Sequence, residues 1–202
     1  MNIKNMKEDE KKLEFTLEDS NPPTANAIRR TLQREIPTLA VTKVSFFQNS
    51  TPLFDEYIAH RIGMTPLSTP KDYDKEESNP TTMMTLTAKE PGIVHAEEID
   101  IEDPKVKPVY PKTPIVKLGE NQEIELEGTI KLGLGKEHAR HKPCLATYKT
   151  ETDKEAKKDP ETNFHFTVES YVKKEPKKLL EQSLNIIEEK ANELKEKIEE
   201  TE

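Results

Sequence analysis

Three residues with metal-binding side chains, His138, His141 and Cys144, follow one another at intervals of three in the sequence. Imidazole nitrogen and thiolate sulfur are ligands that Zn²⁺ accepts, so this spacing suggests a metal site. A closed zinc site needs four ligands, however, and no clear fourth ligand accompanies these three. Pro143 also disfavours a regular helix through all of them. We therefore expect no metal here, and we interpret the segment as a surface loop.

A second pair, His60 and Arg61, has the residue types of a general base beside an anion-binding cation. No nucleophile or second acid lies at a useful spacing from the pair, so we expect no catalytic residue in this chain. The two residues end a predicted short helix, which favours a structural or interface role. The Gly-Leu-Gly run at 133–135 is too short to be a nucleotide-binding loop.

Arg29 and Arg30 lie on a predicted helix, opposite an apolar face formed by Ala25, Ile28 and Leu32. Adjacent arginines often form only a solvated basic face, but they also suit a contact with a partner protein. The residue types alone leave both interpretations open.

The composition points to a chain that completes its core elsewhere. In 202 residues, 35% are charged and 32% are hydrophobic, which is lean for one or two independent domains. Such a chain either carries long solvated segments or buries part of its apolar surface against a partner. The formal net charge of −8 argues against a protein whose main ligand is nucleic acid.

Cys144 is the single cysteine of the sequence. It excludes an internal disulfide and any multi-cysteine metal or iron–sulfur site built from this chain alone. The first fifteen residues contain no apolar run of the kind found in signal peptides. No stretch approaches 18 consecutive apolar residues, so we expect no membrane span and a cytoplasmic protein.

Periodicity predicts a chain that contains both strands and helices. The first expected helix has Asn21 as its N-cap and Pro22 at its first position, and it ends before Pro37. Gly128 interrupts the apolar face of one strand, and we interpret it as a bulge or bend. The expected strands are 10–19, 39–48, 82–88, 93–101, 114–118, 122–134 and 164–168, the expected helices are 22–35, 52–63 and one beginning at Pro176, and 149–162 is a charged linker.

The final segment carries the clearest periodicity. Its apolar residues follow at spacings of 4, 3, 4, 3 and 4, which is a heptad seam, and Leu179 and Ile186 widen its first half. The seam either packs on the chain's own sheet or binds a partner helix, and it can also divide between the two. We favour the intermolecular role. The seam consists of Leu180, Leu184, Ile187, Ala191, Leu194 and Ile198.

Three long segments resemble one protein family, the assembly subunits of DNA-directed RNA polymerase. They are NPPTANAIRRTLQREIPTLAVTKVSF (21–46), NSTPLFDEYIAHRIGMTPL (49–67) and GLGKEHARHKPCLATY (133–148). The family comprises the bacterial alpha subunit, the third-largest subunit of eukaryotic RNA polymerase II and their archaeal counterpart. The short length of the chain favours the archaeal branch.

The resemblance implies an α+β fold, with a discontinuous dimerisation domain of sheet and helices, 1–48 and 163–202, and a mostly β insertion domain, 49–162. It further implies a non-catalytic scaffold that heterodimerises with an L-type subunit and contacts other small and large polymerase subunits, while DNA is reached only through the complex. Cys144 alone cannot hold the iron–sulfur cluster of some archaeal relatives, so no cofactor is expected. Because the sequence stops at Glu202, we expect no DNA-binding domain of the bacterial alpha type. The implied partner-binding residues are Asn26, Arg29, Arg30, His60, Arg61 and the heptad seam.

Two alternatives remain at this point. The first is a homodimeric adaptor that uses the same terminal helix, as bacterial alpha does. The second is a small metal-dependent hydrolase built on His138 and His141 with an acid. A mass measurement separates the first from a heterodimer, and the second requires a bound metal.

Overall fold

The computed structural model describes residues 1–70, 73, 81–150 and 163–201. The chain forms two compact units, one of Met1–Ile36 with Lys142–Glu202 and the other of Pro37–His141. These limits differ from the predicted domain boundaries at 48/49 and 162/163. The strand at 38–49 lies wholly in the second unit because it pairs with a strand of that unit along its whole length. The strand at 144–150 lies in the first unit because it pairs with the strand at 164–170.

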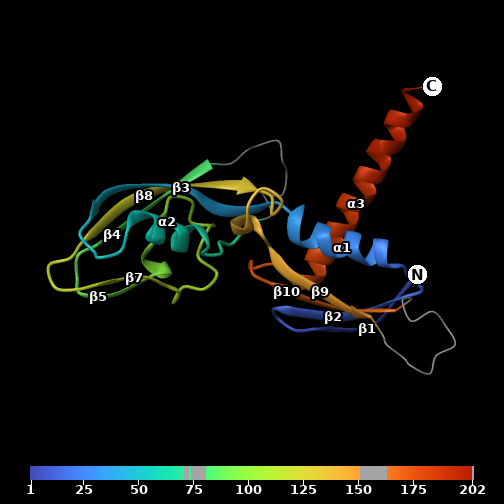
Figure 1. The fold of residues 1–202 in the computed structure, drawn as a ribbon, viewed down its shortest axis with the longest axis horizontal. Helices are drawn as coiled ribbons and strands as arrows, with labels where there is room; N and C mark the ends of the chain where they lie inside the picture. Colours follow the sequence, from blue (N-terminus) through green and yellow to red (C-terminus); the bar gives the residue numbers. More distant parts are fainter. Residues whose placement is uncertain (71–72, 74–80, 151–162, 202) are drawn as a thin grey trace. The chain divides into compact units, whose positions relative to one another are not determined.

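The first unit is an antiparallel sheet with the strand order β1-β2-β10-β9, and two helices pack on it (Figure 1). The predicted α+β class is confirmed. The charged linker predicted at 149–162 falls almost entirely outside the described residues. The elements of this unit are β1 (Asn2–Glu8), β2 (Lys12–Glu18), α1 (Pro22–Arg34), β9 (Cys144–Thr150), β10 (Phe164–Ser170) and α3 (Pro176–Glu199).

Helix α1 begins and ends where the sequence predicts. The Asn21 side chain accepts a hydrogen bond from the backbone N–H of Thr24 at 2.9 Å, so one of the free amides of the first turn is satisfied. Pro22 occupies the first position, where its missing N–H costs nothing. The apolar stripe of α1, formed by Ala25, Ile28 and Leu32, is buried.

The core of the first unit is formed by alternate residues of the strands. Leu13 and Phe15 on β2 face the helices, and the Phe15 ring stacks on Phe166 of β10 with the centroids 4.9 Å apart. Leu179 and Leu180, in the first turns of α3, complete this core. At about 1.5–3 kcal/mol for each large apolar side chain fully buried, these residues hold α3 on the sheet.

The second unit contains a sheet with the order β3-β8-β4-β6 and a ribbon of β5 and β7. Helix α2 packs on β3 through Ile58 and Ile62, which are buried. The strand predicted over 93–101 is interrupted by a 3₁₀ turn, because the Glu98 carboxylate accepts the backbone N–H of His95 at 2.6 Å. The elements are β3 (Thr38–Asn49), α2 (Asp55–Gly63), β4 (Thr81–Ala88), β5 (Gly92–His95), η2 (Ala96–Glu98), β6 (Asp100–Ile101), β7 (Pro114–Leu118), β8 (Ile124–Gly133) and η3 (Ala139–His141).

Gly128 plays a different part from the one predicted. It pairs regularly with Val44 on one side and Met84 on the other, and the nearby register shift is in β3. A Cβ at Gly128 would lie 3.0 Å from the carbonyl oxygen of Lys43. The glycine therefore permits a close approach of backbone, and the bulge prediction at this residue was wrong.

Candidate functional site

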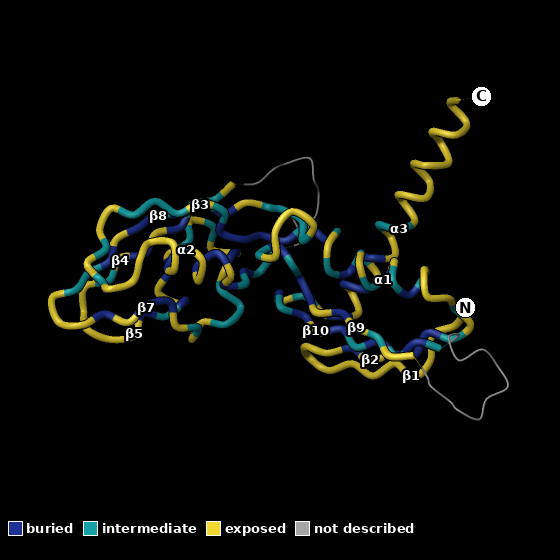
Figure 2. Tube along the Cα trace, in the orientation of Figure 1, coloured by how far each residue is buried: buried dark blue, intermediate teal, exposed yellow. Residues whose placement is uncertain are grey.

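The heptad seam of α3 divides into a buried part and an exposed part. Leu180 is buried in the core of the first unit, and Ile187 is half-buried against that core. Leu184, between these two residues, is 38% exposed, and beyond Ile187 the seam is uncovered, with Leu194 and Ile198 62% and 58% exposed. Figure 2 shows the outer turns of α3 exposed along their length. The inner part of the seam therefore packs on the chain's own unit, which is one of the possibilities that the periodicity left open, and the outer part is exposed.

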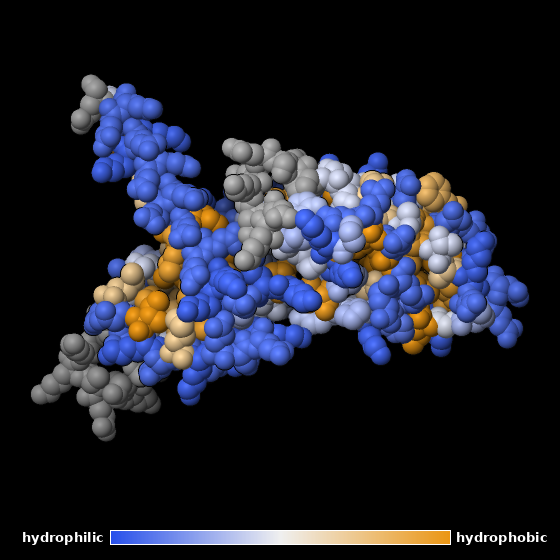
Figure 3. All heavy atoms as spheres, turned by 180° about the vertical axis from the view of Figure 1, so that it is seen from behind, coloured by the Kyte–Doolittle hydropathy of each residue, from blue (hydrophilic) through white to orange (hydrophobic). Residues whose placement is uncertain are grey.

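An ion pair marks one of the outer contacts of α3 with its own unit. The Lys190 ammonium lies 3.2 Å from the Glu35 carboxylate at the end of α1. Every residue of α3 from 191 to 199 is exposed. In the view of Figure 3 the outer turns present mainly hydrophilic side chains, and hydrophobic ones gather at the base of the helix. The helix therefore extends beyond the body it packs on and keeps a narrow apolar seam.

The solvent face of α1 forms a basic hollow lined by Asn26, Arg29, Arg30, Gln33 and Arg34. The Arg29 Nε and Nη2 atoms donate to Asn26 Oδ1 at 3.2 and 2.8 Å, which fixes that guanidinium on the helix surface. Gln33 Nε2 donates to the Ala146 carbonyl at 2.6 Å and ties the helix to β9. The sequence argument missed Gln33 and Arg34. Their positions 7 and 8 residues after Asn26 place them on the same helical face, and this spacing was the available signal.

His60 and Arg61 lie in the second unit, at the end of α2. Both side chains are exposed, but Arg61 Nη2 donates to the Pro114 carbonyl at 2.6 Å, so its guanidinium also fixes α2 to β7. The residues predicted to bind partners are therefore shared between two units. Asn26, Arg29 and the seam belong to the first unit, and His60 and Arg61 belong to the second.

The three side chains of the His-x-x-His-x-x-Cys segment form hydrogen bonds within the fold. Buried His141 donates its Nδ1–H to the Thr38 carbonyl at 2.7 Å, and burial lowers the pKa of its imidazole. His138 Nδ1 accepts from the Arg140 backbone N–H and Nε, both at 3.1 Å. Cys144 donates to the Leu32 carbonyl at 3.3 Å, and burial raises the pKa of its thiol to about 12. A thiol held protonated is a poor metal ligand, because metals bind the thiolate.

Within the described ranges, no cluster of three or more His, Cys, Asp or Glu side chains is arranged to hold a metal ion. The helices that the structure describes include none with the length and apolar character needed to cross a membrane.

The fold defines the chain as an α+β protein in which a mostly β unit is inserted between the two parts of a sheet-and-helix unit. Residues 43–147 match the model of the RNA polymerase Rpb3/RpoA insert domain. This range covers most of the second unit and reaches into β9.

Similar curated proteins carry the name DNA-directed RNA polymerase subunit Rpo3. The Pyrococcus horikoshii protein is 44% identical over 151 residues, which are 73% of this chain and 58% of that protein. The Methanosphaera stadtmanae protein is 34% identical over 200 residues, 90% of this chain and 71% of that protein. The chain spans just over half the length of the first relatives, 58% and 55%. The chain therefore belongs to the Rpo3 family of archaeal RNA polymerase subunits.

Proposed function

We propose that the chain is a non-catalytic assembly subunit of an archaeal DNA-directed RNA polymerase and that it heterodimerises with an L-type subunit through α3. The observation that carries this proposal is the exposed outer half of the heptad seam. Leu194 and Ile198 continue the line of residues that packs the start of α3 on its own unit. A partner helix that continues this packing would bury them.

Burial of the exposed part of the seam would favour association with a partner helix. Two large apolar side chains, fully buried, contribute about 1.5–3 kcal/mol each. The flanking positions of α3 are mostly Glu and Lys, which suit a polar rim around an apolar helix–helix contact. The narrow seam thus favours one long helix as its partner.

The basic hollow on α1 is proposed as a second contact, with a large polymerase subunit. Asn26 holds the Arg29 guanidinium in place before binding, so less side-chain entropy is lost on binding. Arg30 and Arg34 add two exposed cations on the same face, and a carboxylate-bearing surface is the matching chemistry. On the second unit, His60 and Arg61 are proposed as a further partner contact.

No active site and no resident cofactor are proposed for this chain. In this account the L-type heterodimer is the platform on which the large catalytic subunits assemble in the cytoplasm, other small subunits join it, and DNA is reached only through the whole enzyme. The structural partners of His138, His141 and Cys144 support this view over a metal-dependent hydrolase.

Co-expression with the L-type subunit, followed by size-exclusion chromatography with light scattering, tests the proposal. We expect a stable 1:1 complex that is lost in L194D/I198D. Because both side chains are exposed in the single chain, this variant should keep the circular dichroism of the parent. N185D/N192D is the matched control, since it adds the same charge off the seam. A homodimer, or a monomer indifferent to the L-type subunit, would contradict the heterodimer.

A further inference from the structure

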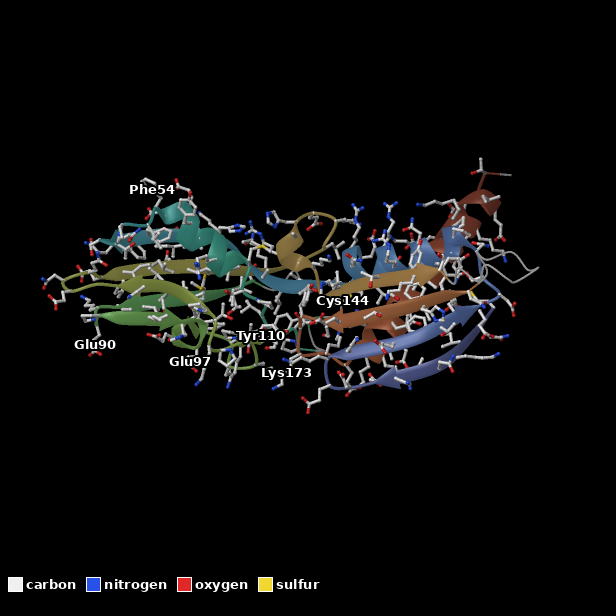
Figure 4. All side chains as sticks on the ribbon, turned by 60° about the horizontal axis from the view of Figure 1, so that its bottom comes forward. Phe54, Glu90, Glu97, Tyr110, Cys144 and Lys173 are labelled. Atoms are coloured by element: carbon white, nitrogen blue, oxygen red, sulfur yellow. The ribbon has the colours of Figure 1, made fainter. Side chains whose placement is uncertain are left out.

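A second apolar surface lies on the other unit, where the chain passes from β3 into α2. It consists of Leu53, Phe54 and Tyr57 and is called the aromatic patch below. The Phe54 and Tyr57 side chains are 71% and 64% exposed, and their rings stack with centroids 6.3 Å apart. In Figure 4 Phe54 projects outward beside the first turn of α2. Clustered exposed aromatic residues of this kind mark interaction sites, whereas single exposed ones do not.

The loop that presents the patch is held by Asn49. The Asn49 Nδ2 donates to the Leu53 carbonyl at 3.0 Å and to Asp55 Oδ1 at 2.7 Å. Its Oδ1 accepts from Thr51, from the backbone N–H at 3.1 Å and from the hydroxyl at 2.7 Å. Four hydrogen bonds from one side chain fix the loop, so docking on it costs little ordering entropy.

The turn formed by residues 119–123 is hydrogen-bonded to the same loop. The backbone N–H of Ser50 donates to the Glu123 carbonyl at 3.1 Å, and the backbone N–H of Glu123 donates to the Ser50 hydroxyl at 2.7 Å. The two segments therefore form one presented surface.

The position of Phe54 breaks a local rule of helix formation. It is the N-cap of α2, where Ser, Thr, Asp and Asn are preferred because their side chains bond the free amides. Phe54 makes no such bond. The core of the unit does not require it either, since α2 packs inward through Ile58 and Ile62. Phe54 therefore makes no capping bond and packs on α2 only through the exposed ring of Tyr57, and at a loop held by hydrogen bonds this indicates a role outside this chain.

The charges around the patch select the chemistry of the partner. Residues 44–60 contain Asp55 and Glu56 and no lysine or arginine. In the supporting turn, Glu120 is exposed and Glu123 pairs with Lys89 at 3.3 Å. An acidic border disfavours nucleic acid, and it disfavours a symmetric contact with a second copy, which would bring like charges together.

We propose that the aromatic patch docks a polymerase subunit other than the partner of α3, through an apolar pocket bordered by lysine and arginine. The inference rests on the proposed function in one respect, that the partner is a subunit of the same complex. Phe54 and Tyr57 are the anchors of the contact, and Glu56 supplies a charge that steers the basic border toward it.

The test uses polymerase reconstituted from separately purified subunits, with retention of each subunit measured by quantitative mass spectrometry. We expect F54S/Y57S to weaken the binding of one subunit at least tenfold. E56K should weaken the binding of the same subunit, and raised salt should reduce the difference in binding between E56K and the parent. The matched control is I93S, which removes another exposed apolar side chain, 52% exposed, from the same unit.

Photocrosslinking from p-benzoylphenylalanine in place of Phe54 gives an answer that does not depend on these variants. A crosslink to a lysine- or arginine-rich segment of one subunit supports the proposal. The absence of a crosslink in assembled polymerase overturns it, and so does a crosslink to DNA, to a second copy or to an acidic segment. The α3 heterodimer is measured in the same samples. Its loss would contradict the proposed function, whereas an intact heterodimer with no effect at the patch contradicts this inference alone.

Discussion

Gly133 and His141 form a steric lock inside the second unit, and substituting Gly133 with alanine should break it. A Cβ at Gly133 would lie 2.6 Å from His141 Nε2 and 2.8 Å from the ring carbons Cδ2 and Cε1. Non-bonded carbon atoms are favourably placed only from about 3.5 Å apart, so the buried ring has to move by nearly an ångström. That movement strains the 2.7 Å hydrogen bond from His141 Nδ1–H to the Thr38 carbonyl.

The cost of this substitution follows from two terms. Overpacking of a well-packed site costs about 1–3 kcal/mol, and disturbing a buried hydrogen bond costs about 1–3 kcal/mol. We expect G133A to lower the free energy of unfolding by about 2–4 kcal/mol, since the two terms overlap. H141A alone should also destabilise, because it removes the hydrogen bond to Thr38 and the packing of the ring.

A double-mutant cycle distinguishes the lock from a general intolerance of alanine. Urea denaturation followed by circular dichroism supplies the four free energies of unfolding. In the H141A background the space above Gly133 is open, so G133A should cost less than about 1 kcal/mol there. Equal costs of G133A in the two backgrounds would refute the steric explanation.

Three further predictions concern stability and reactivity. Burial lowers the pKa of the His141 imidazole below its ordinary 6.5, so as the pH falls the unfolded chain binds a proton at this residue before the folded chain does. The contribution of neutral His141 to the free energy of unfolding is therefore complete above pH 6.5 and should decline below it. Urea titrations at pH 5 and 7 should show this decline in the parent, and H141A should lack it. Because the Cys144 thiol is buried with its pKa raised to about 12, it should resist a disulfide reagent at pH 8 in the native chain and react at once in denaturant, and rapid native labelling would contradict its burial. F166A should lower the free energy of unfolding by about 3–5 kcal/mol in the same urea assay, since it also removes the stack with Phe15, and a loss below about 1 kcal/mol would show that this core position is not tightly packed.

The sequence predicted the helices whose ends and faces are set by residues close together in the chain. Asn21 and Pro22 set the start of α1, and the spacing of the apolar residues gave α3. The sequence analysis missed the edge strand β1. All of its residues are exposed, so they show no apolar alternation, and the strand is defined by its pairing with β2. The unit boundaries differ from those predicted for a related reason. The strands β3 and β9 belong to the unit that contains their pairing partners, and those partners are distant in the sequence.

The candidate surfaces also depend on contacts between residues that are distant in the sequence, which the sequence alone does not reveal. The heptad spacing predicted an apolar seam, but only the fold shows that it leaves the core after Ile187. The chemistry suggested by His141 and Cys144 was ambiguous in the sequence, since their carbonyl partners Thr38 and Leu32 are 103 and 112 residues away. The hydrogen bonds of Asn49 are local, yet their effect becomes visible only when Phe54 is found exposed beyond them.

Amide hydrogen exchange of the chain, alone and with an equimolar L-type subunit, tests the central claim most directly. The account predicts slower exchange in the outer turns of α3, around Leu194 and Ile198, with β4 and β8 of the second unit unchanged. A complex that forms without protecting α3 would contradict the proposed interface. Unchanged exchange throughout, with no complex formed, would contradict the heterodimer itself.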